Sequence, residues 1–473
     1  MNLLKFLFIG LEVLMLFNLL IFVHELGHFL AAKWRGMRVD RFAIWFGKPI
    51  WKKKIRGVEY ALGWIPAGGY VLLPQMATME AIEGKSETPA ETLPNVSALD
   101  KIIVSFAGPL FSFGLAVVFA AIVTTIGCPV HEADSTTVIG YVDPDGPAAK
   151  AGLLPGDRIL DVDGQPVTKF GGIGASVVWR VVSSVGETVA VKVDRAGKEV
   201  EFNVVPTHEP NKAWHRKSLR EIKIMPSQTA LVAEVMTNSP AEVAGIRAGD
   251  ALVSINGEPV YHYEKVTDYI QKHPKEAIKF EVERDGKRFL ATIRPETPLT
   301  PADAKPMIGV AWDGAGRMTI KYPGVLEQIE GSLAAMAGTF GAILSSKSDI
   351  KMQHLGGAVK ILSVYYLLFQ SDYGWRMAIW FSVIMNVNLA LLNLVPFPVL
   401  DGGHIVLSLI EAIRRKPLSI RLMQHIQTGC AVLVIVFMAY IAVFDVQDLL
   451  GGGGKEKASA LKFAPKAASS PAR

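Results

Sequence analysis

The sequence predicts an α-helical polytopic membrane protein, with about four transmembrane helices and two inserted, extracytoplasmic domains of the β-rich α+β class. Two observations lead to this fold class. Half of the 473 residues are hydrophobic, which is high for a soluble protein but low for a pure membrane bundle. Long apolar segments flank a more polar stretch that contains a sequence repeat. The net charge of +5 includes no long basic or acidic run, so no nucleic-acid partner is expected.

Four apolar segments are long enough, or nearly so, to cross about 30 Å of hydrocarbon. They run roughly Phe6–Ala32, Ile102–Gly127, Met377–Val395 and Thr428–Phe444. The first also has features of a secretory signal peptide, with Lys5 before it and Ala31-Ala32 near its end. Cleavage there would remove the metal-binding motif described below, so a retained helix is the favoured interpretation.

Basic residues next to these segments predict the orientation of the chain. The stretch Lys33–Arg56 has nine Lys and Arg against one acid, and the loop Gly403–His425 has four against one. Both are therefore predicted to be cytoplasmic loops by the positive-inside rule. Both termini and residues 128–375 then lie outside the cytoplasm. The lysines that follow Gly451 disagree mildly with this assignment.

Residues 128–375 contain an internal repeat. The pattern from Pro147 to Val167 recurs from Pro240 to Val260, and every matched position is offset by 93 residues. Asp-Gly in the first copy and Asn-Gly in the second predict hairpin turns, and an Ala-Gly step predicts a short helix that ends at Gly. Such an offset suits two copies of one small domain, over 135–226 and 227–312. Both copies resemble bacterial, circularly permuted PDZ domains, which implies either peptide capture at a sheet edge or a role limited to blocking access.

The other segments complete the predicted organisation. Residues 1–127 form an N-terminal membrane part, 313–450 a C-terminal membrane part, and 451–473 a disordered tail rich in Gly, Lys, Ala and Ser. Within 323–370, apolar residues near helical spacing predict an amphipathic helix on the membrane surface, and Gly356–Phe369 predicts an interfacial or partly inserted helix. Cys128 and Cys430 fall near opposite membrane faces and are expected to be free.

The run His24-Glu25-Leu26-Gly27-His28 is the most informative motif, because it lies inside an apolar segment. Residues four apart share one helix face, so His24 and His28 can hold one metal ion together. Glu25 can take a proton from a water bound to that metal. Burying two imidazoles and a carboxylate at bilayer depth costs on the order of a few kcal/mol unless they have partners, and a zinc ion uses all three. The alternative is a pair of core histidines beside an unrelated acid.

A catalytic zinc ion takes three protein ligands and leaves one position open for water. The first and third spans run in the same direction, which places Asn393–His404 beside the motif at the cytoplasmic end. Two prolines break the helix there, and Asp401, the only acid of this stretch, is the predicted third ligand. His404 is the rival ligand. Asn393 is expected to donate a hydrogen bond to the substrate carbonyl or the developing oxyanion, or else to bond the backbone freed by Pro396.

Together these motifs resemble the site-2 protease family of intramembrane zinc metalloproteases, and in particular its RseP-type bacterial branch with tandem PDZ domains. The resemblance spans nearly the whole chain and rests on His24–Ala32, Phe42–Pro49, Pro66–Val71 and Asn393–Gly402. Read alone, Val58–Leu73 is a plausible hairpin with a Gly-Gly kink. The resemblance implies that residues 58–74 form a β-hairpin that re-enters the membrane, and that its edge, with Gly68, Gly69 and Tyr70, binds an unwound substrate strand.

The resemblance also implies a function. It is that of a zinc-dependent intramembrane endopeptidase with one Zn²⁺ per chain, in which His24, His28 and Asp401 bind the metal and Glu25 is the general base. The implied substrates are transmembrane segments of single-span proteins already trimmed by a first protease, such as a membrane-bound anti-sigma factor or remnant signal peptides. The implied location is the bacterial inner membrane, with the active site toward the cytoplasmic leaflet. Rival classes are a PDZ scaffold with a structural zinc site and a zinc transporter.

Two departures from the family pattern are visible. Ser112 stands near where relatives often have Asn, and Leu355–Val359 replaces a more usual Ser-Gly-Pro-Ile. Neither is expected to touch a zinc ligand. Both are therefore expected to affect substrate fit and helix packing, not catalysis.

Overall fold

The computed structural model describes residues 3–76, 93, 96–210, 215–301, 303–416, 420–451 and 461–465. The chain falls into two compact units. We call them the helical unit (Met1–Cys128, Lys321–Met336 and Leu355–Val446) and the β-rich unit (Pro129–Ile320, Ala337–His354 and Gln447–Arg473). Each unit is therefore assembled from segments that lie far apart in the sequence.

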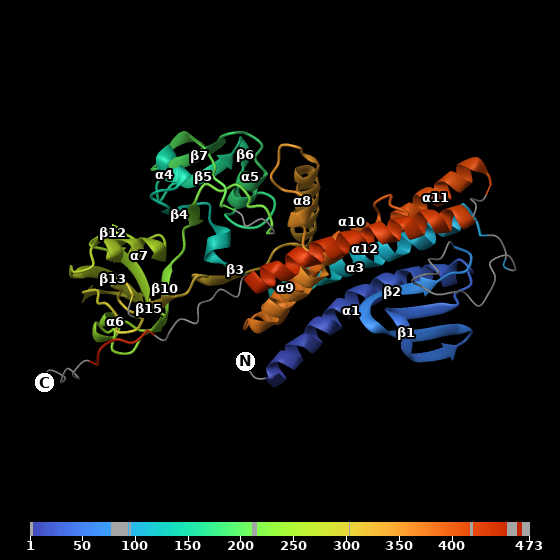
Figure 1. Cartoon of the computed structure of the whole chain (residues 1–473), viewed down its shortest axis with the longest axis horizontal. Helices are drawn as coiled ribbons and strands as arrows, with labels where there is room; N and C mark the ends of the chain where they lie inside the picture. The colour runs from blue at the N-terminus through green and yellow to red at the C-terminus, as the bar shows by residue number, and fades with distance from the viewer. Residues whose placement is uncertain are drawn as a thin grey trace. The chain divides into compact units, whose positions relative to one another are not determined.

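Four helices of the described residues are long and apolar enough to cross a membrane, and all belong to the helical unit except the last residues of the fourth, from Gln447 onward. They are α1 (Leu3–Trp34), α3 (Ala98–Ile126), α10 (Gly374–Asn393) and residues Met423–Leu450 within α12 (Ile420–Gly451). Each coincides with one of the four predicted spans. Helix α3 packs against α1, α10 and the shorter α11 (Asp401–Arg414), and Figure 1 shows these elements in one layer of long helices.

The contact between α1 and α3 follows the helical period. Its buried residues recur every three or four positions, which places them on one face of each helix: Ile9, Val13, Leu16 and Leu20 on α1, and Ala116, Phe119, Ala120 and Val123 on α3. Nearer the end of α1, Gly27 allows the two helices to approach closely, because a Cβ atom there would lie 2.4 Å from the carbonyl oxygen of Ala107. This close approach occurs within the histidine motif.

A twisted sheet follows α1 and contacts it. It consists of β1 (Arg41–Ile55) and β2 (Val58–Leu72), which are joined at Arg56-Gly57 by a turn with positive φ at both residues. The start of β1 lies between the two halves of β2, since Arg41 is paired with both Glu59 and Leu72. Positive φ values at Trp45, Gly47 and Gly68 mark the bends that make this possible.

This sheet corrects one prediction. Residues 58–74 do not form a hairpin on their own; Val58–Leu72 is one strand that pairs with the basic stretch before it. The sequence predicted that stretch as a loop because its lysines mask the strand pattern. The pairing partner of the Gly-Gly segment lies about 25 residues earlier, at Ala43 and Ile44, which a local turn pattern does not reveal.

The β-rich unit contains two similar sets of elements in sequence. The first set is β4 (Ile139–Val142), α4 (Pro147–Ala151), β5 (Arg158–Val162), β6 (Gln165–Pro166), α5 (Val177–Ser183), β7 (Val189–Arg195), β8 (Lys198–Val204) and β9 (Ile224–Pro226). The second is β10 (Ala230–Val235), α6 (Pro240–Val243), β11 (Ala251–Ile255), β12 (Glu258–Pro259), α7 (Tyr263–Lys272), β13 (Ile278–Arg284), β14 (Lys287–Ile293) and β15 (Val310–Trp312). The main sheets have the orders β6-β5-β7-β8 and β14-β13-β11-β10-β15, and β12 pairs with β11.

The predicted turns and short helices of the repeat are confirmed. Asp163-Gly164 and Asn256-Gly257 both have positive φ at the two turn residues, as tight hairpin turns require. Helix α4 ends directly before Gly152, and α6 ends two residues before Gly245; these glycines have φ of +94° and +80°. The copies also share an ion pair between a buried aspartate and a partly exposed arginine, which the sequence comparison did not single out. Its members are Asp157 with Arg195 in the first copy, and Asp250 with Arg284 in the second.

Shorter elements complete the fold: β3 (Cys128–His131), β16 (Met318–Lys321), α8 (Val325–Leu344), α9 (Ala358–Gln370) and single 3-10 turns at Glu132–Ser135 and Met352–His354. The two helices expected within 323–370 are therefore present as α8 and α9. Cys128 and Cys430 are not joined to each other by a disulfide. Most of the predicted disordered tail lies outside the described residues, but Leu461–Pro465 is placed, and Phe463 there is only 4% exposed.

Candidate metal centre

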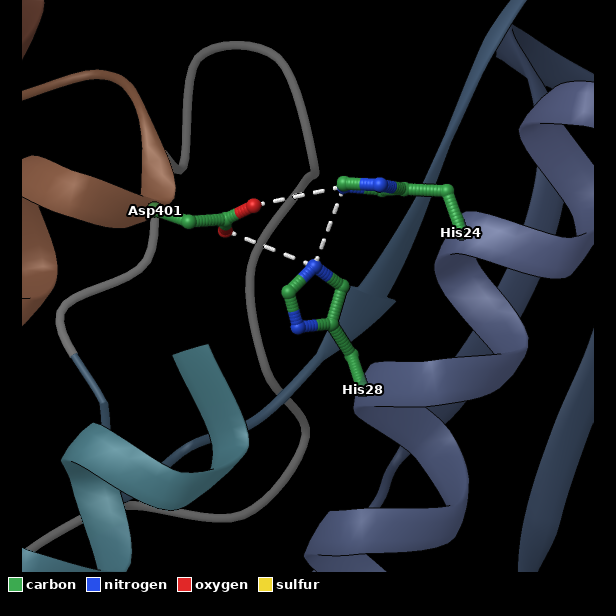
Figure 2. Close-up of side chains that lie close together, drawn as sticks. All are labelled: His24, His28 and Asp401. Atoms are coloured by element: carbon green, nitrogen blue, oxygen red, sulfur yellow. Dashed lines mark hydrogen bonds and ion pairs between the residues drawn. The ribbon is translucent and has the colours of Figure 1, made fainter. Parts of the chain in front are cut away.

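His24 and His28 lie one turn apart on α1, and their Nε2 atoms are 3.3 Å from each other. Asp401, the first residue of α11, faces them. Its Oδ2 lies 3.3 Å from Nε2 of His24 and its Oδ1 lies 3.4 Å from Nε2 of His28. Figure 2 shows the three side chains converging from the two helices. Within the described residues, this is the one group of three or more His, Cys, Asp or Glu close enough to hold a metal ion together.

The break between α10 and α11 brings Asp401 to this position. Helix α10 ends at Asn393, and α11 begins only at Asp401, after the Pro-Phe-Pro sequence. Gly402 and Gly403 allow α11 to start against the preceding chain. A Cβ atom at these positions would lie 2.2 Å from the carbonyl oxygen of Leu394 and 2.1 Å from that of Phe397. Any larger residue would therefore displace the aspartate.

Helix α3 orients both imidazoles. Nδ1 of His28 is 2.8 Å from the carbonyl oxygen of Val104, to which it can donate a hydrogen bond. Nδ1 of His24 is 2.9 Å from Oγ of the buried Ser112. With protons on both Nδ1 atoms, the lone pairs of both Nε2 atoms are directed toward the space in front of Asp401.

This contact shows that one expectation is wrong. Ser112 was predicted not to touch a zinc ligand, yet its hydroxyl is the partner of His24. The sequence pattern that corresponds to this contact can be recognised only once the structure is known. Val104 and Ser112 are eight residues apart, about two helical turns, and the close approach at Gly27 brings α3 alongside the two histidines.

Gly108 of α3 keeps the space between the donors free. A Cβ atom at this position would lie 2.2 Å from Nε2 of His28 and 2.9 Å from Nε2 of His24. Even a methyl group would therefore press on the two nitrogen atoms. The absence of a side chain at residue 108 is a structural requirement of this site.

The donors fit a zinc ion. Nitrogen and oxygen ligands lie about 2.0–2.2 Å from zinc, so donors in a tetrahedral arrangement are about 3.4 Å from one another. The two Nε2 atoms are 3.3 Å apart, and each lies 3.3–3.4 Å from a different oxygen of the Asp401 carboxylate. One donor atom from each of the three residues lies within 4.8 Å of the other two. Oδ2 of Asp401 is buried and accepts no hydrogen bond within the described chain. Three protein donors leave one of four positions open, as in catalytic zinc sites.

A cavity of about 670 Å³ in the helical unit opens onto these donors. Glu25, Gly69, Tyr70, Asn393 and His404 line it with the three donors. The structure therefore brings together the predicted metal ligands, the predicted base and all but one of the predicted substrate contacts. The exception is Gly68, which does not line the cavity and lies against the ring of Phe46.

Ser105 lines the same cavity and was not predicted. It is 2% exposed, and its hydroxyl has no hydrogen-bond partner among the described residues. Ser105 lies three residues before Gly108, so both belong to the face of α3 that meets the metal donors.

Tyr70 is held in place by stacking on Phe46 and by Arg41, whose Nη1 donates to the Tyr70 hydroxyl at 3.2 Å.

Comparison with known proteins relates the chain to metalloproteases. The sequence model described as "Peptidase family M50" matches residues 12–437. A Neisseria meningitidis protein named "Putative zinc metalloprotease" is 30% identical over 450 residues, which cover 92% of this chain and 97% of the relative. The "Regulator of sigma-E protease RseP" of Salmonella typhimurium is 29% identical over 446 residues, covering 90% of this chain and 96% of the relative.

Among solved structures, a PDZ domain of an SdrC-like protein from Listeria monocytogenes is similar to part of the chain. It is 22% identical, with a TM-score of 0.17, and the match covers 19% of this chain and 93% of that domain.

Proposed function

The chain belongs to peptidase family M50 and is a membrane zinc metalloprotease, and we propose that His24, His28 and Asp401 bind its zinc, one ion per chain, with Glu25 as the general base. The observation that carries this assignment is the convergence of two imidazole nitrogens, 3.3 Å apart, on the carboxylate of Asp401, beside a space kept open by Gly108. Glu25 is next to His24 in sequence and lines the same cavity.

Each residue of the site has a separate role in the proposed hydrolysis. A zinc ion bound there supplies a Lewis acid that activates water and polarises the scissile carbonyl. The carboxylate of Glu25 takes the proton of the attacking water and later passes it to the leaving amine. Ser112 and Val104 hold the imidazoles in the tautomer that presents Nε2. To Asn393 and Ser105, which both line the cavity, we assign hydrogen bonds to the substrate carbonyl.

The substrate must enter as an extended strand. A transmembrane helix shields its carbonyls by internal hydrogen bonds, so the helix has to unwind before hydrolysis. Residues Gly69–Leu72 of β2 pair with β1 on one side only within the described residues, and Gly69, Tyr70 and Val71 line the cavity. We assign to this edge the binding of the unwound strand by backbone hydrogen bonds. Gly69 lies against Glu25, since a Cβ atom at Gly69 would be 2.9 Å from Cγ of Glu25.

We also propose the cellular setting. The protein lies in a bacterial inner membrane with the metal centre toward the cytoplasmic leaflet, and the β-rich unit lies outside the cytoplasm. Its substrates are membrane proteins already shortened by another protease, such as a membrane-bound anti-sigma factor, in line with the relative named as a regulator of sigma-E protease. The two repeated domains, which we regard as PDZ domains over 135–226 and 227–312, then exclude untrimmed substrates by size or bind their ends.

Cleavage of a single-span reporter by the purified protein in detergent tests this function. Wild type and Glu25→Gln are compared, and mass spectrometry locates the cut. We expect wild type alone to cut, inside the apolar segment of the reporter, since the glutamine cannot take up the proton. Equal cutting by both proteins would refute the role of Glu25. A panel of trimmed reporters left intact by a wild-type protein that retains zinc would favour the scaffold function instead.

A further inference from the structure

A short segment near the C-terminus lies on the second repeated domain of the β-rich unit. Leu461–Pro465 pairs with the chain between β14 and β15, where Thr300 and Lys462 form an antiparallel bridge. The backbone N–H of Leu299 donates to the carbonyl oxygen of Lys462 at 2.6 Å. The N–H of Lys462 in turn donates to the carbonyl oxygen of Thr300 at 3.4 Å. Figure 1 shows this segment in red beside β15 and α6.

The side chains of the segment alternate as those of a surface strand do. Lys462 and Ala464 are exposed, whereas Phe463 between them is buried. The backbone hydrogen bonds of this segment do not depend on its side chains. The ring of Phe463 is therefore the feature by which a docking site would distinguish one peptide sequence from another.

Gly309 provides the room for that ring. A Cβ atom at Gly309 would lie 2.9 Å from Cε2 of Phe463 and 2.3 Å from Cβ of Ser239. Gly309 has a φ of +80°, which favours glycine at this position independently of the ring. It directly precedes β15, so the ring is buried where the chain enters the edge strand of the sheet.

We propose that Leu461–Pro465 is a tethered peptide ligand, which fills a docking site for extended, phenylalanine-containing segments formed by Leu299, Thr300, Gly309 and Ser239. Three features carry the inference: two backbone hydrogen bonds in strand geometry, one buried aromatic side chain between exposed neighbours, and a glycine that leaves space for it. Because the ligand is part of the same chain, its local concentration is high, and it must leave before a separate peptide can bind. The site is distinct from the metal centre and does not depend on the proposed peptidase function.

Fluorescence anisotropy of a labelled peptide with the sequence of residues 459–467 tests the proposal. The receptor is the detergent-solubilised chain in the Glu25→Gln background, which prevents cleavage of the probe by Glu25-dependent chemistry. We expect a chain truncated after Ala460 to bind the peptide saturably, and the untruncated chain to bind it at least about tenfold more weakly, equivalent to about 1.4 kcal/mol. A peptide with alanine in place of the phenylalanine should bind the truncated chain at least about tenfold more weakly than the parent peptide.

Two full-length variants provide the matched controls. Phe463→Ala should expose the site to the labelled peptide, whereas Lys462→Ala should behave as wild type, since Lys462 contacts the domain through its backbone. Hydrogen exchange at the amide of Leu299 gives a readout without a probe, and it should become faster on truncation. Failure of the truncated chain to bind the peptide, equal binding by truncated and full-length chains, or unchanged exchange at Leu299 would each overturn the proposal.

Discussion

Ser112 and Val104 determine how the two imidazoles of α1 present their Nε2 atoms. Neither residue is a metal donor, but each offers an oxygen to the Nδ1 of one histidine. Such partners fix both the tautomer and the ring orientation of a metal-binding histidine. The carbonyl of Val104 cannot be removed by mutation, whereas the hydroxyl of Ser112 can.

Ser112→Ala is therefore expected to weaken zinc binding about 10- to 100-fold, the usual cost of losing such a partner. Ser105→Ala is the matched control, because it removes a buried hydroxyl of the same helix that has no hydrogen-bond partner within the described residues. Competition with a chromophoric chelator measures the affinity. Equal zinc affinity in the two variants would show that the Ser112 contact does not orient His24.

His262 has a different role, in the β-rich unit. It caps α7 by accepting a hydrogen bond at Nδ1 from the N–H of Glu264, and it is 3% exposed. Burial lowers the pKa of His262 from 6.5 to about 4. The unfolded chain then binds the proton more readily than the folded one, so stability falls as pH drops from 6.5 toward 4 and is fully present at higher pH.

This shift predicts that the second repeated domain is about 2 kcal/mol less stable at pH 5 than at pH 7. Hydrogen exchange of peptides from β13, corrected for the intrinsic rate at each pH, measures the opening free energy in the full chain. His262→Asn keeps a capping acceptor but cannot titrate, and it should flatten this dependence. If the asparagine variant retains the full pH dependence, another group is responsible.

At the residue scale, the sequence singled out the three side chains that the structure brings together, but not the partners of those side chains. His24, His28 and Asp401 could be grouped from the sequence because their spacing and the chemistry of zinc restrict the choice to a few side chains. Ser112 and Gly108 act through contacts between α1 and α3, and a single sequence does not give the rotation of one helix against another. Gly68 was placed with its neighbours by proximity in sequence, whereas its positive φ directs it toward Phe46.

The edge of β2 is the element to which we assign the binding of the substrate strand. The N–H of Asp40 donates to the carbonyl oxygen of Leu72 at 3.0 Å, so the backbone groups of Leu72 face β1. Because successive residues of a strand alternate, those of Val71 face the opposite side, toward the open edge. Val71 also lines the cavity.

Val71→Pro should therefore lower the rate of reporter cleavage about tenfold, by removing one hydrogen bond to the substrate strand. Proline is tolerated where the lost N–H is directed away from the sheet, so the fold should persist. Val71→Ala, which keeps the N–H, is the control, and zinc content reports on the integrity of both proteins. Unimpaired cleavage by a zinc-loaded Val71→Pro variant would contradict strand addition at this edge.

Elements stabilised by local patterns were predictable, and those stabilised by distant pairing were not. The four long helices follow from runs of apolar residues, and the hairpin turns of the repeat follow from Asp163-Gly164 and Asn256-Gly257. The sheet of β1 and β2 depends on a basic stretch that pairs twice with the same strand. Its lysines are exposed and favour no particular secondary structure, so the sequence carries no local signal for the strand.

At the scale of the whole molecule, the charge pattern and the structure give different kinds of information. The basic residues predict which side of the membrane each loop occupies, whereas the structure shows which segments pack together. It groups Ala337–His354 with the β-rich unit, although the sequence assigned them to the C-terminal membrane part. The buried Arg220, whose Nε lies 2.8 Å from Asp349, helps to hold this segment there. Such long-range ion pairs leave no pattern in the sequence.

The proposed orientation predicts opposite labelling of two exposed positions. In a chain whose native cysteines are replaced, Lys198→Cys in β8 should react with a membrane-impermeant maleimide in intact spheroplasts. Lys53→Cys in β1 should react only after lysis, because its basic stretch lies in the cytoplasm. Both positions are exposed in the structure, so burial does not account for a difference. The reverse pattern would invert the topology and place the metal centre toward the outer leaflet.

The central claim is that α1 and α11 jointly hold one zinc ion through His24, His28 and Asp401. Zinc per chain, measured by mass spectrometry of the purified protein, tests it most directly. The account predicts one zinc ion in wild type, in Glu25→Gln and in His404→Ala, and loss of the metal in Asp401→Ala. The two zinc-retaining variants change residues that line the same cavity, so they control for disturbance of the site. Zinc retained by Asp401→Ala, or lost from His404→Ala with the fold intact, would contradict the assignment of the third ligand.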